Sequence, residues 1–325
     1  MLTIDAYRAA FIKYLEQRVV TKEPQSLYEP ITYILKLGGK RLRPVLTLLT
    51  AEIFETDYNE ALNAALAVEV FHNFSLVHDD IMDDAPLRRG KQTVHEKWDL
   101  NTGILSGDAM LIQAYQLFES YDDNIFRGLA QIFSKTALEV CEGQQYDVDF
   151  ELRNDVTEAE YLKMIEYKTA VLVGAAMKMG ALVANASKED SEKIYEFGRL
   201  LGIAFQLQDD YLDAFGNPET FGKQVGGDII ENKKTYLYLK AMKHAAKEEQ
   251  QQLVQLFNNE VEVTVAEKVA YVKQVFETSN AAQLTKEAIK NYTQKALDIL
   301  NELSIDSSKK KVLIDFSESL MSRTV

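Results

Sequence analysis

Residues 72–90 of the chain read HNFSLVHDDIMDDAPLRRG. This stretch ends an apolar helical run with aspartates at 79, 80, 83 and 84, and arginines follow at 88 and 89. Asp79 and Asp83 are four residues apart, so on a helix their carboxylates lie on one face and repel each other. Mg²⁺ removes that repulsion, because it binds carboxylate oxygens and shares its coordination shell with substrate phosphates. Guanidinium groups match phosphate oxygens. The stretch therefore predicts a site for a metal ion and a diphosphate.

The composition is that of a globular chain with ample apolar material for a core. Of its 325 residues, 46% are hydrophobic and 26% are charged. No Ser/Gly-rich or low-complexity run interrupts the sequence, which predicts a single domain over residues 1–325. The single cysteine, Cys141, excludes internal disulfides and indicates a reducing compartment. Residues 1–5 lack a signal-peptide pattern, and no apolar run is long enough to span a bilayer. We therefore expect a cytoplasmic protein without a membrane span.

The net charge of −14 argues against nucleic acid as a partner. It would also oppose the binding of diphosphates if the acids were spread evenly. The conflict disappears if the acids cluster and hold metal ions, which invert the local potential.

Almost every segment repeats its apolar residues with the 3.6-residue period of a helix. Residues 260–265 alone resemble a strand, and we expect a loop or a helix start there. The predicted class is all-α, a bundle of roughly a dozen helices. We predict helices over residues 5–19, 33–37, 45–54, 59–82, 104–118, 125–145, 157–179 and 191–215, followed by helical hairpins.

A second acidic cluster repeats the spacing of the first. Residues 206–213 read QLQDDYLD, so Asp209, Asp210 and Asp213 follow the same i, i+1, i+4 pattern on another apolar helix. One such triplet could be a solvated helix end, but two with identical spacing are hard to explain in that way. If the two helices face each other, six carboxylates surround one cavity and require several divalent ions.

The chain resembles the trans-isoprenyl diphosphate synthases of the polyprenyl synthetase family. Asp79, Asp80 and Asp83 resemble the first Asp-rich motif of the family, and residues 209–213 resemble the second. This resemblance implies a single helical bundle around a central apolar cavity, the isoprenoid synthase type. Other matches, in chain order, are residues 38–44 (GGKRLRP), His72, Arg88-Arg89-Gly90, Gly107-Asp108, Gly143-Gln144, Lys168-Thr169, Phe205-Gln206, Gly222-Lys223, Gly227-Asp228 and Lys233.

The resemblance implies a head-to-tail condensation by a short-chain trans-prenyltransferase. An allylic diphosphate loses pyrophosphate, the carbocation alkylates isopentenyl diphosphate, and a proton leaves, taken by the released pyrophosphate. Three Mg²⁺ ions per site act as Lewis acid and template. The implied metal-binding residues, direct or through water, are Asp79, Asp80, Asp83, Asp209, Asp210 and Asp213. The residues implied for the allylic diphosphate and its ionisation are Arg88, Lys168, Thr169, Gln206, Lys223 and Lys233.

Isopentenyl diphosphate needs an anion site without a metal. The residues implied for it are Lys40, Arg41, His72 and Arg89. Alternatively, Lys40, Arg41 and Arg43 only decorate a helix start. The resemblance also implies a homodimer as the active form.

Product length is expected to depend on the residues below the first triplet. Ser75 and Phe74 precede Asp79 by four and five residues, about 6–8 Å at 1.5 Å per residue. Ser75 leaves room, whereas Phe74, with Phe71 one turn further, can stop a growing chain. The alternative is that both phenylalanines are ordinary core residues. A single aromatic residue here, with no insertion in the first motif, resembles the geranylgeranyl type. We predict a C20 product, with C15 (farnesyl) as the alternative.

Other functions fit the sequence less well. A class I terpene cyclase usually lacks the second triplet and needs no isopentenyl site. A non-catalytic regulatory subunit of a heteromeric prenyltransferase would be expected to lose acidic ligands, and both triplets are intact here.

Several other polar residues have simpler interpretations. Glu69 and His72 form one Glu-x-x-His pair, but a di-iron bundle needs two. His78 and His95 lack metal-like spacing and are expected to be structural or to orient the metal ligands from behind. Solvated side chains are expected at Asp84 and Lys309–Lys311, and a supporting role at Asp228.

Overall fold

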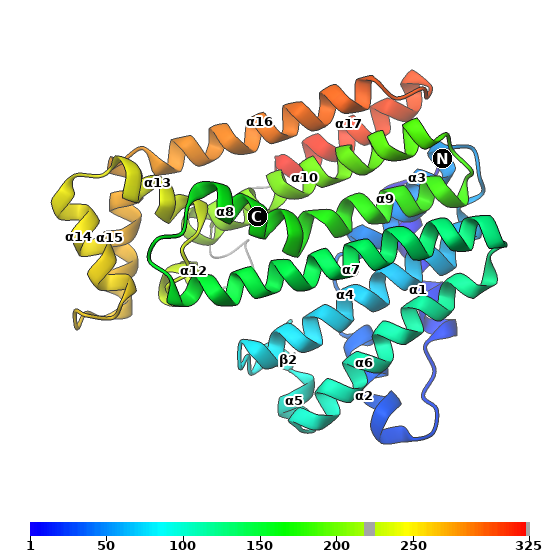
Figure 1. Ribbon diagram of the computed structural model, residues 1–325, viewed down its shortest axis with the longest axis horizontal. Helices are drawn as coiled ribbons and strands as arrows, with labels where there is room; N and C mark the ends of the chain where they lie inside the picture. The colour runs from blue at the N-terminus through cyan, green and yellow to red at the C-terminus, as the bar shows by residue number, and fades with distance from the viewer. Residues whose placement is uncertain (218–224, 323–325) are drawn as a thin grey trace. The chain divides into compact units, whose positions relative to one another are not determined.

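The computed structural model describes residues 1–217 and 225–322, so the predicted cation Lys223 lies outside the described residues. Most described residues are helical and the described strands form one two-stranded hairpin, which confirms the all-α class (Figure 1). None of the described helices is long and apolar enough to cross a membrane. The elements are α1 (Ile4–Arg18), α2 (Gln25–Lys36), α3 (Leu42–Ile53), η1 (Tyr58–Ala61), α4 (Leu62–Met82), β1 (Leu87–Arg88), β2 (Lys91–Gln92), α5 (Val94–Lys97), α6 (Leu100–Gln116), η2 (Leu117–Ser120), α7 (Asp123–Leu152), α8 (Glu158–Ile165), η3 (Glu166–Ala170), α9 (Val171–Val183), α10 (Lys188–Phe215), α12 (Gly227–Ile230), α13 (Tyr236–His244), α14 (Lys247–Phe257), α15 (Val265–Thr278), α16 (Ala281–Asn301) and α17 (Ser307–Met321).

The chain divides into two compact units. The first comprises residues 1–135 and 175–195, and the second comprises the described residues of 136–174 and 196–325. A single domain over residues 1–325 stays a prediction.

In the first unit, α4 packs against α3 and α6. It buries residues on all its faces, as its nearly uniform apolar sequence predicts.

The short helix predicted over residues 33–37 corresponds to the end of α2. Its predicted start at residue 33 is wrong, because α2 begins at Gln25. Pro24 occupies the N-cap in an extended conformation, and Pro30 is accommodated inside the helix. The predicted stop is confirmed: Gly38 and Gly39 follow with φ of 86° and 120°, which suit glycine.

A small hairpin follows α4 and was not predicted. Its strands β1 and β2 pair in antiparallel fashion, with Leu87 opposite Gln92. Arg89 and Gly90 form the two-residue turn, and both have positive φ, which matches the twist of the strands. The Thr93 side chain closes the loop by donating to the Ala85 carbonyl at 2.8 Å. The sequence signal for this hairpin is weak, because Arg-Gly stands at the turn in place of the usual Asn-Gly or Asp-Gly.

In the second unit, the predicted helix over residues 157–179 is interrupted. Its start is confirmed, because Thr157 and Glu160 form a capping box at the start of α8. Between α8 and α9, however, η3 is a π-helical turn in which the Val171 N–H bonds to the Glu166 carbonyl. Such turns are uncommon and are found frequently at functional sites.

The C-terminal part of the second unit includes α13 to α16 (Figure 1). These helices contribute to an apolar cluster that includes Leu237, Leu253 and Phe276. Residues 260–264 are a loop, and Thr264 caps α15, which begins at Val265. The prediction of a loop or helix start there is confirmed.

Candidate active site

The first triplet lies at the C-terminal end of α4. Asp80 is fully buried, and its Oδ1 accepts a hydrogen bond from Arg88 Nε at 2.8 Å. Burial raises the pKa of Asp80, and the adjacent Arg88 opposes that rise. Asp79 is half-buried, whereas Asp83 is exposed. The three carboxylates therefore differ in burial and in partners. Asp80 is already paired with Arg88, which is itself predicted to bind the allylic diphosphate.

His72 lies seven residues before Asp79 on α4, about two helical turns earlier, and its surroundings are strongly positive. Arg43 Nη1 is 3.3 Å from His72 Nε2. Burial, followed by the charges of Arg43, Arg89, Arg41 and Arg88, holds the pKa of His72 well below its usual value. Four guanidinium groups thus surround a neutral imidazole, which makes this part of the first unit a site that attracts anions.

Arg41 and Arg89, like Arg88 with Asp80, have internal partners. Arg41 is only 6% exposed and donates to the Glu69 carboxylate and to the Leu35 carbonyl. Glu69 also accepts from Asn73, so the Glu-x-x-His pair is engaged in core contacts. Arg89 donates to the Gly38 carbonyl, and a Cβ at Gly39 would lie 2.8 Å from its guanidinium.

Arg43 was left out of the predicted diphosphate ligands. It follows the predicted basic residues directly and contacts His72, so it belongs with the cationic cluster (Arg41, Arg43, His72, Arg88 and Arg89). Lys40 is exposed, and its carbonyl accepts from Arg8.

The residues below the first triplet form an aromatic layer. The ring centroids of Phe71 and Phe74 are 5.5 Å apart, and Phe71 also contacts Phe133 at 5.1 Å. Phe71 is 1% exposed and Phe74 is 8% exposed. The Ser75 hydroxyl donates to the His72 carbonyl. Phe71 is thus a core residue whatever else it does, while Phe74 keeps some accessible surface.

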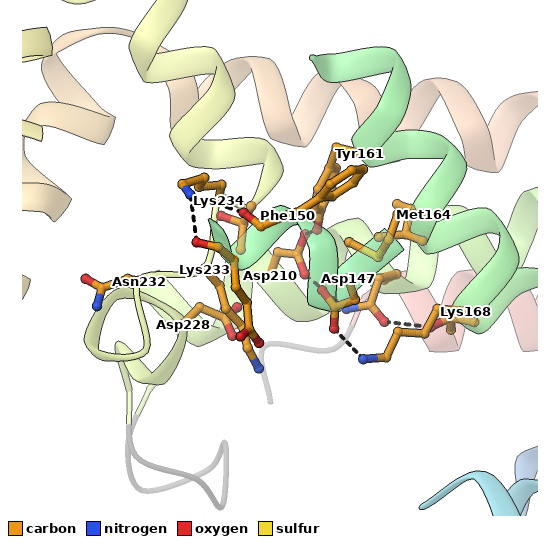
Figure 2. Close-up of a pocket in the computed structure, with 15 residues that line it drawn as sticks. Asp147, Phe150, Tyr161, Met164, Lys168, Asp210, Asp228, Asn232, Lys233 and Lys234 are labelled. Atoms are coloured by element: carbon orange, nitrogen blue, oxygen red, sulfur yellow. Dashed lines mark hydrogen bonds and ion pairs between the residues drawn. The ribbon is translucent and has the colours of Figure 1, made fainter. Parts of the chain in front are cut away.

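The second unit contains a pocket of about 140 Å³ (Figure 2). It collects polar residues from α7, α8, η3, α10, α12 and the segment before α13. Its polar lining includes Asp147, Glu151, Tyr161, Lys168, Thr169, Gln206, Asp210, Asp228, Asn232, Lys233, Lys234 and Thr235. Four residues predicted for the allylic diphosphate, all those that the structure describes in this unit, therefore line one pocket.

The π-helical turn η3 carries Lys168 and Thr169 and is held between two glycines. A Cβ at Gly143 of α7 would lie 2.2 Å from the Lys168 backbone nitrogen. A Cβ at Gly202 of α10 would lie 2.7 Å from the Ala170 Cα. Only glycine permits such close backbone approach, so both helices fix the turn.

A chain of hydrogen bonds connects this turn with α10 and α8. Thr169 Oγ1 lies 3.2 Å from Gln206 Oε1, and Gln206 Nε2 donates to Asp210 Oδ1 at 3.0 Å. Tyr161 donates its hydroxyl to Asp210 Oδ2. Burial and the nearby Asp228 raise the pKa of Asp210 well above its usual value.

The lysines of the pocket have distinct partners. Lys168 Nζ contacts Asp147 Oδ2 of α7 (Figure 2). Lys233 pairs with Glu231 at 2.8 Å, and this contact, with nearby Asp228, raises its pKa against the opposing effect of burial. Lys234 donates to carbonyls at the end of α7, including Phe150 at 3.1 Å, and so caps that helix. Asp147 and Lys234 were not predicted, because they carry no motif of their own.

The other two aspartates of the second triplet are half-buried on α10. Asp213 Oδ2 accepts from the Asp228 backbone N–H at 3.0 Å, so it holds the start of α12. Asp209 and Asp213 offer the carboxylate oxygens that Mg²⁺ prefers, as do Asp79 and Asp83 in the first unit. Six carboxylates around one cavity stay a prediction.

The hairpin also brings His95 close to two acids. Single ligand atoms of Asp84, His95 and Glu96 lie within 4.8 Å of one another. His95 Nε2 is 3.8 Å from Glu96 Oε1. The sequence spacing gave no sign of this group, because the reversal at β1–β2 creates it.

Fold and site together define an all-α protein with a cationic cluster in one unit and a lysine- and carboxylate-lined pocket in the other. The family described as "Polyprenyl synthetase" matches residues 24–278. The chain is 38% identical over 311 residues to the geranylgeranyl diphosphate synthase of Methanosarcina mazei, covering 95% of this chain and 93% of that protein. The chain therefore belongs to the polyprenyl synthetase family, and the prediction of a prenyltransferase of this family is confirmed.

Solved structures agree with this assignment. A crystal structure of a geranylgeranyl pyrophosphate synthase has a TM-score of 0.95 and 57% sequence identity, with 99% of both chains covered. The geranylgeranyl pyrophosphate synthetase of Pyrococcus horikoshii has a TM-score of 0.91 and 31% identity, with 98% of this chain and 97% of that chain covered. Members of the family generally use Mg²⁺.

Proposed function

We propose that this protein condenses isopentenyl diphosphate with allylic diphosphates and releases geranylgeranyl diphosphate, a C20 product. The observation that carries the proposal is the 57% identity, over nearly the whole chain, to a structure named as a geranylgeranyl pyrophosphate synthase. The aromatic layer under the first triplet supports the same product length, because Phe74 occupies the position at which we expect a growing chain to stop.

The cationic cluster of the first unit is the proposed site for isopentenyl diphosphate. The neutral His72 can donate one hydrogen bond, and Arg43 and Arg89 supply charge beside it. Arg41, being buried against Glu69, contributes through its field and by shaping the start of α3. Lys40 is the exposed member of the proposed set.

The pocket of the second unit is the proposed site for ionisation of the allylic diphosphate. Lys168 and Lys233, with Lys223 proposed from the sequence, provide positive charge where pyrophosphate develops. Asp147 holds the Lys168 ammonium, and Gln206 holds Thr169. Arg88 is the proposed cation from the first unit, aligned by Asp80.

The metal-binding residues proposed are Asp79, Asp80 and Asp83 of α4 and Asp209, Asp210 and Asp213 of α10, with three Mg²⁺ ions per site. When bound, Mg²⁺ supplies Lewis acidity toward the leaving pyrophosphate. The chain's own residues bind and orient both diphosphates, and the released pyrophosphate is the proposed base for the final proton.

The proposed active form is a homodimer in the cytoplasm. Leu105 and Ile112 support pairing of two chains, because they are seven residues apart on α6 and each is 59% exposed. Sedimentation of the purified protein tests this proposal. A monomer at micromolar concentration with full activity would contradict it.

The product is tested by incubating the purified chain and Mg²⁺ with isopentenyl diphosphate and dimethylallyl, geranyl or farnesyl diphosphate, followed by chromatography of the dephosphorylated products. We expect C20 from every starter. Products of C30 or longer would refute the C20 assignment. Absence of pyrophosphate release from the lone polypeptide would favour the regulatory-subunit alternative.

A further inference from the structure

The turn that follows α12 brings Lys233 to the pocket of the second unit. Asn232 has a φ of 60°, and its N–H donates to the Ile229 carbonyl at 3.3 Å. The next N–H, that of Lys233, donates to the Asp228 carbonyl at 2.9 Å. These two bonds around a left-handed residue form a Schellman motif, which ends a helix with glycine or asparagine at this position. The conformation of Asn232 therefore sets the direction in which the chain leaves α12 and Lys233 joins the pocket lining.

A buried lysine of α15 holds the side chain of Asn232. Lys268 is 8% exposed, and its ammonium donates to Asn232 Oδ1. Figure 2 shows the Asn232 amide pointing away from Lys168. The amide thus connects the turn with α15, while the adjacent Lys233 lines the pocket.

Helix α15 also fixes the start of α12. A Cβ at Gly226, the residue before α12, would lie 2.9 Å from Val269 Cγ1. Val269 follows Lys268 directly, so adjacent residues of α15 contact the start of this four-residue helix and the turn at its end. Because the start is already anchored, the hydrogen bond from Lys268 determines where the end of the turn lies.

The surroundings of Lys268 indicate a positional task rather than a stabilising one. Its ammonium lies 5.6 Å above the Phe257 ring, and within the described part of the chain no carboxylate pairs with it. A buried ammonium with one amide oxygen and one ring as partners recovers little of its lost hydration. An apolar side chain of similar length would fill the same space without that penalty. The charge at this position is therefore explained by the bond to Asn232, the residue before Lys233.

We propose that Lys268 is a positioning residue that sets the place of Lys233 in the pocket through Asn232, and thereby the affinity for the allylic diphosphate. The inference rests on the proposed function, in which Lys233 supplies positive charge to that substrate. Lys268 lies 36 residues from Asn232 along the chain and belongs to none of the motifs recognised in the sequence. It acts on the substrate only through the turn.

Three substitutions isolate this contact. Lys268→Met removes the ammonium and keeps an unbranched apolar side chain in its place. Asn232→Gly removes the acceptor, while glycine readily keeps the left-handed conformation of the turn. Lys273→Met is the matched control, because Lys273 is also on α15 and its ammonium also lies 5.6 Å above a phenylalanine ring, that of Phe215. Of these two lysines, Lys268 is the one that donates to the turn after α12.

The experiment measures kcat and KM for both substrates with the purified chain and Mg²⁺, and follows unfolding in urea by circular dichroism. We expect Lys268→Met and Asn232→Gly each to lower kcat/KM for the allylic diphosphate at least about tenfold, because small displacements of a substrate-positioning group have effects of this size. The KM for isopentenyl diphosphate should stay within about twofold of wild type, as should every kinetic value of Lys273→Met. The urea midpoint of Lys268→Met should not fall. In a Lys233→Met background, where the ammonium to be positioned is absent, Lys268→Met should cause no further loss.

The outcomes separate the two levels of the proposal. An inactive wild-type protein refutes the proposed function itself. With an active wild type, the inference is overturned if Lys268→Met and Lys273→Met are equally active, or if Lys268→Met keeps its full effect in the Lys233→Met background. A loss of stability without a loss of kcat/KM would make Lys268 a core residue and would overturn it as well. If Lys268→Met fails to fold, Asn232→Gly decides the matter, because an unchanged kcat/KM for the allylic diphosphate in that variant overturns the inference.

Discussion

Asp80 and Asp210 are each the second aspartate of a triplet, and both are buried, but their partners carry different charge. Asp80 of the first unit accepts from the guanidinium of Arg88. Asp210 of the second unit accepts from two neutral donors, Tyr161 and Gln206, while nearby Asp228 adds to the rise of its pKa. Identical spacing thus determines where a carboxylate lies on its helix, whereas its electrostatic environment comes from whatever packs against that helix.

The largest expected effect is the loss of activity when one aspartate of either triplet is removed. Equal losses would show that both triplets serve the same reaction, although their buried aspartates have different partners. Asp79→Ala and Asp209→Ala should each lower kcat/KM by at least about 10³-fold, because each removes a carboxylate proposed to bind Mg²⁺ and with it several kcal/mol of transition-state stabilisation. Release of pyrophosphate is the measurement. Removal of Mg²⁺ with EDTA should abolish the wild-type rate, and added Mg²⁺ should restore it. A severe loss in only one of the two variants would mean that the triplets are not equivalent.

The second effect concerns stability and separates Asp80 from Asp210. Asp80→Asn should lower the free energy of unfolding by about 2 kcal/mol, less than for a fully buried pair because Arg88 is 30% exposed. Asp210→Asn should change it by less than about 1 kcal/mol, because asparagine still accepts from Tyr161 and no longer repels Asp228. Urea unfolding followed by circular dichroism measures both values. Equal losses would show that the charge of the partner is unimportant.

The third effect tests the cationic surroundings of the first unit by pH. The pKa of His72 is lower in the folded protein than in the unfolded chain, so the folded state resists protonation. His72 therefore contributes stability that is present above pH of about 6.5 and is lost as the pH falls below that value, by up to about 1.4 kcal/mol per pH unit. His72→Gln should reduce this slope in urea unfolding between pH 5 and 7. His244→Gln, which changes a histidine outside the cationic cluster, is the control. Identical slopes in all three proteins would contradict the depressed pKa.

The smallest effect concerns product distribution rather than rate or stability. Phe74→Ala should shift part of the product beyond C20, because it opens the aromatic layer below the first triplet. Phe118→Leu changes another ring of the same unit, which is fully buried behind Phe133, and should leave the product length unchanged. Chromatography of the dephosphorylated products compares the two. If both variants give only C20, Phe74 is an ordinary core residue.

The parts of the structure that depend on local sequence could be predicted. The all-α class, the capping box at Thr157 and the helix stop at Gly38 follow from periodicity and from residue types at fixed offsets. The π-helical turn could not be predicted, because it depends on close approach of Gly143 and Gly202, which are distant in the sequence. For the same reason the sequence identified Gln206 and Asp210 but not Tyr161, which reaches Asp210 only through a contact made on folding.

The π-helical turn also has a consequence for the evolution of this chain. A turn closed by i→i+5 hydrogen bonds holds one residue more than an α-helical turn, and here that path runs through Glu166 to Ala170. Deleting one residue would restore a regular helix, and α8 would keep its capping box and its buried face. The regular helix, however, would turn Lys168 and Thr169 by about 100° relative to α8 or α9, away from the positions in which they line the pocket. A relative that is one residue shorter at this point should therefore keep the fold and lose the proposed ionisation step, so the length of this segment is informative about activity, as is the identity of its side chains.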